Sequence, residues 1–409
     1  MEGFGSSGVR GVALEDLTPA VALDVAQAAG TVFERDRVAV GRDTRLTGEL
    51  FVSAVASGLA SVGCAVDRVG VVPTPALQAY CEREGVPGVM VTASHNPPEF
   101  NGIKLVGADG VELTRATLDE VEGYLDSDVE LATWDQTGDI REVAGVRRAY
   151  REEVLAAVDR EAIAAADLTV ALDPGHGAGA LTSPEFFTAL GCAVTTVNAQ
   201  PDGYFPGRDP EPVAANLDDL GRLVEATDAD VGIAHDGDAD RAVFFDETGS
   251  FIEGDAALAA LAAAEISGGE TVVSAVNASQ RLVDVVESAG AELHLTPIGS
   301  TNIITAIREL RSQGRRIPVA GEGNGGIIFP GYRIARDGAY TAGRFCELVA
   351  EEPASEVVAD FDGYHNVRRN LSYADEDERR AMLSAIERAA TEATADLDTT
   401  DGYRLDYGD

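Results

Sequence analysis

The chain has 409 residues and a mass of 42.7 kDa, which predicts two to four domains of roughly 100–150 residues each. Apolar residues make up 45% and charged residues 25% of the chain, a composition that argues against a disordered or fibrous protein. The 31 Lys and Arg residues against 70 Asp and Glu give a net charge of −39, which argues against a nucleic-acid-binding protein.

Lys104 is the one lysine of the sequence, and the acidic residues are spread along the whole chain. Both features suggest adaptation to a very salty cytoplasm, where salt screens the self-repulsion of so acidic a protein. The four cysteines form no CxxC pair, and no stretch reaches the ~18 apolar residues of a membrane span. We therefore expect a soluble cytoplasmic protein that binds neither nucleic acid nor membrane.

Strand-like runs followed by Gly-rich or Asp-rich turns and helical stretches recur along the chain. They begin at Val38, Leu168 and Thr271, and this alternation predicts βα units with a largely parallel sheet. A charged helical stretch at 146–160, a turn at 248–250 and an acidic run from 351 suggest boundaries. The predicted domains are 1–145, 146–248, 249–355 and a partial fourth at 356–409.

A strand signature ends at Val91, and the loop after it is stiffened by Pro97 and Pro98. Ser94 and His95 lie in this loop, at the carboxyl end of a predicted parallel strand, where α/β proteins usually bind ligands. An ordinary Ser-His turn is the alternative. The segment is therefore a candidate site for a rigidly held hydroxyl group.

Asp236, Asp238 and Asp240 alternate in a turn between two strand-like segments. Three carboxylates so close together repel one another unless a cation lies among them, and oxygen ligands favour Mg²⁺ or Ca²⁺. An EF-hand is disfavoured, because Arg241 stands where its loop requires glycine and because the flanks look like strands. A solvated acidic turn is the remaining alternative, and Mg²⁺ is the preferred interpretation.

A glycine-rich run from Gly321 to Gly326 follows a predicted strand at 317–320. Its glycines allow a ligand to approach the backbone, and Glu322 and Asn324 offer hydrogen bonds suited to a polyol. A plain loop is the alternative. The run from Gly175 to Gly179 has the spacing GxGxG and not GxGxxG, so we interpret it as a strand-to-helix turn.

In this order, the motifs resemble those of the α-D-phosphohexomutase superfamily, which includes phosphoglucomutase, phosphomannomutase and phosphoglucosamine mutase. The resemblance covers nearly the whole chain and rests on the segments 4–11, 41–45, 92–97, 101–104, 201–206, 236–241, 321–324 and 336–338. It implies three similar mixed-sheet α/β domains around a central cleft. It also implies an enzyme that moves a phosphoryl group between the 1- and 6-positions of a hexose or hexosamine phosphate, with a 1,6-bisphosphate as intermediate and activator.

The resemblance implies a role for each matching residue. Ser94 would carry the phosphoryl group and would bind one Mg²⁺ together with Asp236, Asp238 and Asp240. Arg10 and Arg241 would stabilise the transferring group, Lys104 would act as acid or base, His95 would orient nearby groups, and Glu322, Asn324 and Arg241 would bind substrate. A homodimer is compatible with this resemblance.

Two departures from the family pattern bear on the substrate and on the end of the chain. Asn277 and Ser300 stand where glucose- and mannose-type enzymes often carry Lys and His, so we favour phosphoglucosamine mutase over phosphoglucomutase or phosphomannomutase. Nothing after Asp362 matches the Arg-x-Ser-Gly-Thr-Glu-Pro loop that binds the distal phosphate in the family. We expect an incomplete fourth domain that is either poorly ordered or leans on a neighbour.

Two other classes of function remain open at this point. A metal-dependent sugar phosphatase with a serine nucleophile would use the same serine and aspartates, but it would not need the Glu322 loop or a closed cleft that excludes water. A non-catalytic calcium-binding module is disfavoured by Arg241.

Overall fold

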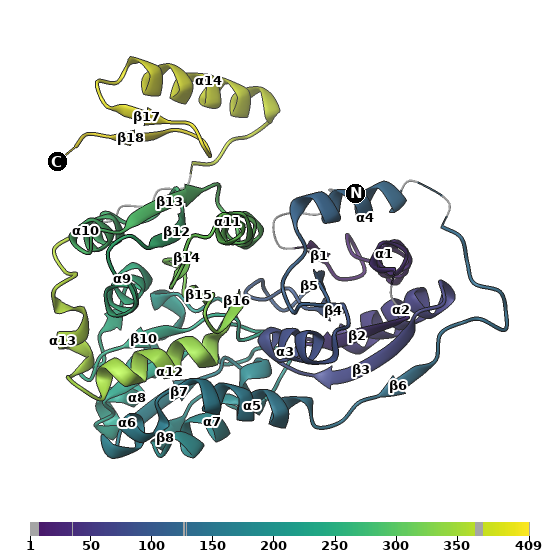
Figure 1. Cartoon of the computed structure of the whole chain (residues 1–409), viewed down its shortest axis with the longest axis horizontal. Coiled ribbons are helices and arrows are strands. Elements are labelled where there is room, and N and C mark those ends of the chain that lie inside the picture. Colours follow the sequence, from purple (N-terminus) through teal and green to yellow (C-terminus); the bar gives the residue numbers. More distant parts are fainter. Residues whose placement is uncertain (1–7, 35, 126, 128, 365–370, 409) are drawn as a thin grey trace.

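A computed structural model describes residues 8–34, 36–125, 127, 129–364 and 371–408. Residues 4–7 of the opening motif lie outside the described part. The chain forms three α/β units, each with one mixed sheet, and a small helix-and-hairpin unit (Figure 1). This arrangement confirms the predicted α/β class with similar mixed-sheet units.

The first unit contains a six-stranded sheet in the order β1-β5-β4-β2-β3-β6. Its strands are β1 (Val9–Val12), β2 (Arg37–Arg42), β3 (Ala65–Val71), β4 (Gly88–Val91), β5 (Phe100–Val106) and β6 (Ile140–Glu142). Its helices are α1 (Pro19–Phe33), α2 (Gly48–Ser61), α3 (Thr74–Glu84) and α4 (Arg115–Leu125). Strands β3, β2 and β4 are parallel neighbours, and β5 pairs antiparallel with both β4 and β1.

The second unit has the sheet order β11-β10-β9-β7-β8. Its elements are α5 (Val146–Ala157), α6 (Arg160–Ala165), β7 (Thr169–Asp173), η1 (Ala178–Leu181), α7 (Ser183–Leu190), β8 (Ala193–Thr196), η2 (Ala214–Asn216), α8 (Asp218–Thr227), β9 (Val231–Ala234), β10 (Val243–Phe245) and β11 (Phe251–Ile252). Because β11 pairs with β10, the turn at 248–250 closes a hairpin and the second sheet extends to Ile252.

The third unit has the sheet order β13-β12-β14-β15-β16. Its elements are α9 (Gly254–Glu265), β12 (Thr271–Ala275), α10 (Gln280–Ser288), β13 (Glu292–Thr296), α11 (Ser300–Ser312), β14 (Ala320–Glu322), β15 (Gly326–Phe329), β16 (Arg333–Arg336), α12 (Gly338–Val349) and α13 (Ala354–Ala359). The strand predicted at 317–320 is wrong in position, since β14 begins only at Ala320. Pro318, which has no N–H to donate to a ladder, lies in the irregular approach to β14.

Local sequence signals explain several helix ends. Thr18 caps α1, its side chain accepting a hydrogen bond from the amide of Val21, and Pro19 occupies the first turn. Asp337 caps α12 in the same way, and Gly85 ends α3 in the left-handed conformation. Thr18 and Asp337 thus fix where α1 and α12 begin, and Gly85 fixes where α3 ends.

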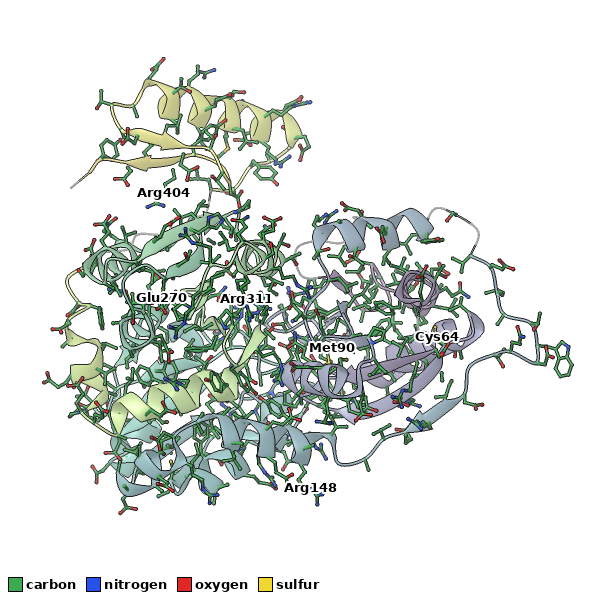
Figure 2. The ribbon with its side chains drawn as sticks, viewed as in Figure 1. Cys64, Met90, Arg148, Glu270, Arg311 and Arg404 are labelled. Atoms are coloured by element: carbon green, nitrogen blue, oxygen red, sulfur yellow. The ribbon has the colours of Figure 1, made fainter. Side chains whose placement is uncertain are left out.

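One apolar core extends through all three units. Phe345 of α12 stacks on Phe244 of β10 with ring centroids 4.0 Å apart, so a helix of the third unit packs against the second sheet. Figure 2 shows Met90 and Cys64 inside the first unit, where both side chains are buried. All four cysteines are free and buried. The shared core holds the loops of the three units in fixed relative positions.

The last segment of the chain forms α14 (Glu376–Glu392) and the hairpin of β17 (Asp396–Asp398) and β18 (Arg404–Asp406). This unit stands apart from the rest of the molecule (Figure 1). It touches the third unit where the amide of Ile298 donates to Asp401 at 2.9 Å. Among the described residues, no helix combines the length and the apolar character that a membrane crossing requires.

Candidate active site

The serine loop and the triple-aspartate loop meet where the first and second units touch. Ser94 lies three residues after the end of β4, and its Oγ donates to Asp236 Oδ2 at 2.7 Å. Its side chain is buried, and its backbone has a φ of +51°. A non-glycine residue with positive φ stores backbone strain, which is concentrated at functional sites. The structure therefore brings together two residues that are 142 positions apart in the sequence.

A buried arginine holds the serine loop in this shape. The guanidinium of Arg45 donates to four backbone carbonyls of the loop, at Ser94, Asn96, Pro97 and Phe100. Arg45 is itself fixed by a salt bridge to Asp43 at 3.1 Å. The planar, five-donor guanidinium suits such multiple contacts, whereas a lysine ammonium would not span them.

Asp43 anchors the serine loop a second time through Thr92, whose Oγ1 donates to Asp43 Oδ2 at 2.6 Å. Thr92 Oγ1 also accepts a hydrogen bond from the amide of Ser94. Burial raises the pKa of Asp43, but the Arg45 guanidinium opposes that effect. Segment 41–45 is one of the family motifs in the sequence, and the fold shows that it supports the serine loop.

In both Asp238 and Asp240, one carboxylate oxygen is hydrogen-bonded to other described residues and the second is not. Asp238 Oδ2 accepts hydrogen bonds from Thr74 Oγ1 at 2.5 Å and from Lys104 Nζ at 3.1 Å. Asp240 Oδ2 accepts from Lys104 Nζ at 3.0 Å and from Arg336 at 2.7 Å. Within the described residues, the Oδ1 atoms of both aspartates are buried without a hydrogen-bond partner.

These free oxygens fit a divalent cation. One oxygen from each of Asp236, Asp238 and Asp240 lies within 4.8 Å of the other two. A buried carboxylate oxygen without a partner is costly, and a hard cation with oxygen ligands removes that cost. The donor set is all oxygen, which suits Mg²⁺ better than Zn²⁺.

The electrostatics of the triad depend on the cations around it. Burial raises the pKa of Asp236 to about 7, and the charges of Asp238 and Asp240 act in the same direction. Burial alone would also raise the pKa of Asp238, but Lys104 and the Thr74 hydrogen bond hold it below its usual value. Burial alone would lower the pKa of Lys104, but Asp238 and Asp240 raise it. Lys104 is therefore held as an ammonium that bridges two carboxylates.

Arg10, His95 and Arg241 lie beside Ser94. One terminal nitrogen of Arg241 is 3.0 Å from His95 Nδ1, so Nδ1 accepts and the imidazole is neutral. Burial lowers the pKa of His95 to about 3, with Arg241 and Arg10 acting in the same direction. Arg10 is oriented by Asn96, whose Oδ1 accepts from it at 2.9 Å. Asn96 is a supporting residue for which the sequence offered no separate signal.

The Glu322 loop lies against the triple-aspartate loop at 236–241, which is called the metal loop from here on because it is the candidate cation site. Glu322 ends β14, and Asn324 turns the chain by accepting a hydrogen bond from the amide of Gly326. The amide of Ala242, next to Arg241, donates to the carbonyl of Gly325 at 3.1 Å. The loop of Asp236, Asp238 and Asp240 thus contacts both the Ser94 loop and the Glu322 loop. Arg10 on β1 and Lys104 on β5 complete the set of predicted site residues.

Comparisons with known proteins agree with this arrangement. The chain matches three family models, described as phosphoglucomutase/phosphomannomutase α/β/α domains I, II and III, at residues 1–131, 148–249 and 253–364. A phosphoglucomutase/phosphomannomutase of Thermococcus kodakarensis is 39% identical, over 99% of this chain and 90% of that protein.

Two further relatives carry related names. A protein of Methanopyrus kandleri named "probable phosphoglucosamine mutase" is 40% identical, over 99% of this chain and 89% of its own length. The crystal structure of a phosphoglucomutase/phosphomannomutase family protein of Burkholderia thailandensis is 27% identical, with a TM-score of 0.82 over 99% of this chain and 88% of that chain.

Proposed function

The chain belongs to the phosphoglucomutase/phosphomannomutase family of the α-D-phosphohexomutase superfamily, whose members are isomerases, and we propose that it acts as a phosphoglucosamine mutase with Ser94 as the phosphorylated residue. The observation that carries the proposal is the Ser94 hydroxyl fixed at 2.7 Å from Asp236. A serine in this position can hold a phosphoryl group next to a cluster of oxygen ligands for a metal.

The proposed reaction moves one phosphoryl group at a time. The bond from phosphorus to Ser94 Oγ breaks, a bond from phosphorus to a sugar hydroxyl oxygen forms, and the hydroxyl proton leaves to a nearby base. The resulting 1,6-bisphosphate turns round and returns its other phosphate to Ser94. Phosphoryl transfer depends mainly on positioning and on neutralising charge, so a fixed serine with Arg10 and Arg241 beside it suits the step.

The residues that would hold Mg²⁺ are Asp236, Asp238 and Asp240, together with Ser94 Oγ or the phosphate on it. When bound, Mg²⁺ supplies a charge that neutralises the oxygens of the transferring phosphoryl group. Lys104 keeps Asp238 and Asp240 in place and contributes a further positive charge. Glu322 and Asn324 would hold the sugar hydroxyls, as the superfamily resemblance implies.

The hexosamine substrate is supported by two observations. The Methanopyrus kandleri relative bears the phosphoglucosamine mutase name at 40% identity. Asn277 and Ser300 replace the Lys and His of many glucose- and mannose-type enzymes, and Ser300 Oγ instead donates to Glu112 at 2.9 Å. The Thermococcus kodakarensis relative, at 39% identity, favours phosphoglucomutase or phosphomannomutase activity as the second candidate.

The proposal is tested by comparing the wild type with Ser94→Ala on a panel of sugar phosphates. Glucosamine, glucose and mannose 1-phosphates are incubated with Mg²⁺ and trace bisphosphate, and 6-phosphate and free phosphate are measured together. We expect 6-phosphate from the wild type, fastest for glucosamine, and none from Ser94→Ala, because the nucleophile is lost without a change in core packing.

Ser57→Ala, at an exposed serine of α2 in the same unit, is the matched control and should keep full turnover. Intact mass should show a phosphate on the wild type and on Ser57→Ala but not on Ser94→Ala. Free phosphate without isomer would favour a phosphatase, and full activity of Ser94→Ala would rule out the phosphoserine mechanism.

A further inference from the structure

Arg336, the last residue of β16 in the third unit, lies beside a carboxylate of the first unit and a carboxylate of the second. Its guanidinium donates to Asp240 Oδ2 of the metal loop at 2.7 Å and lies 3.7 Å from Glu112 Oε1. Burial alone would lower the pKa of Arg336, but Asp240, Glu112 and Glu322 raise it. The side chain is buried, so these charges act on it with little screening by water.

The path of the Arg336 side chain depends on a glycine of the Glu322 loop. A Cβ atom at Gly326 would lie 2.7 Å from Arg336 Cδ, closer than real Cβ contacts allow. Gly326 does not have a positive φ, so its lack of a side chain serves this contact and not the backbone conformation. The Arg336 side chain therefore packs directly on the Glu322 loop, and its guanidinium reaches the metal loop.

Arg336 also determines which oxygen of Asp240 is free. Arg336 and Lys104 both donate to Oδ2, while Oδ1 is buried and has no hydrogen-bond partner within the described residues. Lys104 belongs to the first unit, whereas Arg336 belongs to the same sheet as Glu322. Arg336 is thus the contact through which the third unit orients a proposed metal ligand.

We propose that Arg336 is a positioning residue that couples occupation of the sugar-binding loop to metal binding at the aspartate triad. A sugar hydroxyl bound to Glu322 fixes the position of this loop, including Gly326, against which the Arg336 side chain packs. The guanidinium is then held on Asp240 Oδ2, which keeps Oδ1 directed toward the proposed metal site. This inference rests on the proposed function, since it takes Glu322 as a sugar ligand and the triad as the metal site.

Thermodynamic linkage makes the coupling measurable without turnover, because a sugar phosphate that tightens metal binding must itself be bound more tightly by the metal-loaded protein. We would use the dephosphorylated protein, which cannot transfer a phosphoryl group. Mn²⁺ binding is measured by electron paramagnetic resonance, with and without glucosamine 6-phosphate or glucose 6-phosphate. The readout is the Mn²⁺ dissociation constant without sugar phosphate divided by the constant with it. A ratio is used because removing the positive charge of Arg336 could by itself change the Mn²⁺ affinity in either direction.

We expect a ratio of about fivefold or more for the wild type. In Arg336→Gln the ratio should fall to nearly one. Gly326→Ala should lower it as well, because this variant keeps the arginine but obstructs its path. The matched control is Arg333→Gln, three residues earlier on β16, where an equally buried arginine pairs with Glu82 and Glu153 and not with the triad. Arg333→Gln should lower the melting temperature and keep the wild-type ratio.

A wild-type ratio in Arg336→Gln would overturn the coupling role, as would a ratio of one in the wild type or an equal loss in Arg333→Gln. Failure of the wild type to bind either sugar phosphate would instead contradict the proposed function. Loss of coupling in both Arg336→Gln and Gly326→Ala, with Arg333→Gln unaffected, would support the inference.

Discussion

At the scale of single residues, the site is organised by which oxygen of each carboxylate is already bonded. Lys104 bridges the Oδ2 atoms of Asp238 and Asp240, and Thr74 and Arg336 each add one further donor. Their Oδ1 atoms remain without hydrogen-bond partners in the described structure. The protein therefore fixes the orientation of the carboxylates before any cation binds, which lowers the cost of ordering them.

A change at Asp238 tests this organisation. Asp238→Asn removes one charge from the triad and weakens the bond to Lys104, so we expect the Mg²⁺ concentration for half-maximal activity to rise at least about tenfold. Zn²⁺ should not restore activity, since it is a poorer match for all-oxygen ligands. Asp219→Asn, at an exposed position on α8, is the control. An unchanged Mg²⁺ titration in Asp238→Asn would count against the site.

Residue types and spacing were enough to predict which candidate side chains lie together but not which residues hold them in place. Ser94 and the three aspartates stand out because proline-stiffened loops and alternating carboxylates are unusual in a sequence. Arg45 and Arg336 lie in the matched segments 41–45 and 336–338, but nothing in those segments shows which groups the two arginines support. Their importance comes from burial and from contacts with distant loops, which only the folded chain provides.

At the scale of secondary structure elements, the strands next to the serine loop and the aspartate loop were predicted best. The predicted end at Val91 coincides with the end of β4, and strands β9 and β10 flank the aspartate loop. These strands stand where an EF-hand requires helices, so that alternative is excluded. The approach to β14 was misplaced because Ile317 and Val319 are apolar and buried, although they lie outside any strand.

The contact between the serine loop and the metal loop depends on one glycine. A Cβ atom at Gly237 would lie 2.6 Å from the carbonyl oxygen of Ser94, and this backbone oxygen cannot move easily because Arg45 binds it. Gly237→Ala should therefore separate the two loops. We expect a loss of roughly 1–3 kcal/mol in the free energy of unfolding, together with slower phosphorylation of Ser94 by bisphosphate.

Calorimetry and intact mass against time measure these two effects. The control is Gly123→Ala in α4, where a Cβ meets no atom within 4 Å and alanine should stabilise the helix slightly. If Gly237→Ala were phosphorylated at the wild-type rate, the close approach of the two loops would not be needed for the reaction.

At the scale of the whole molecule, three similar sheets each contribute one loop to the candidate site. In each sheet the central strands run parallel, and later strands return antiparallel beside them. The sequence predicted this repeated pattern but not the shared core, because contacts such as Phe244 on Phe345 join residues of different units. The core is what allows a side chain of the third unit to reach the metal loop.

The charge of the whole molecule predicts a strong dependence of stability on salt. With 70 acidic and 31 basic residues, 39 acidic charges have no basic counterpart, whatever the pairing. Their mutual repulsion destabilises the compact state. Salt also weakens surface ion pairs, but each of those contributes only about 0–1 kcal/mol. Screening of the excess negative charge should therefore outweigh the loss of ion pairs.

We expect the melting temperature to rise with KCl, most steeply between 0.1 and 1 M, where the Debye length falls from about 10 to about 3 Å. Scanning calorimetry over this range measures the effect. A sucrose series is the control, because sucrose favours burial of surface without screening charge. Sucrose should raise the melting temperature gradually, whereas the effect of KCl should level off once screening is complete. A melting temperature that is flat or falls between 0.1 and 1 M KCl would show that this surface is not adapted to high salt, because the repulsion would then be too weak to govern stability.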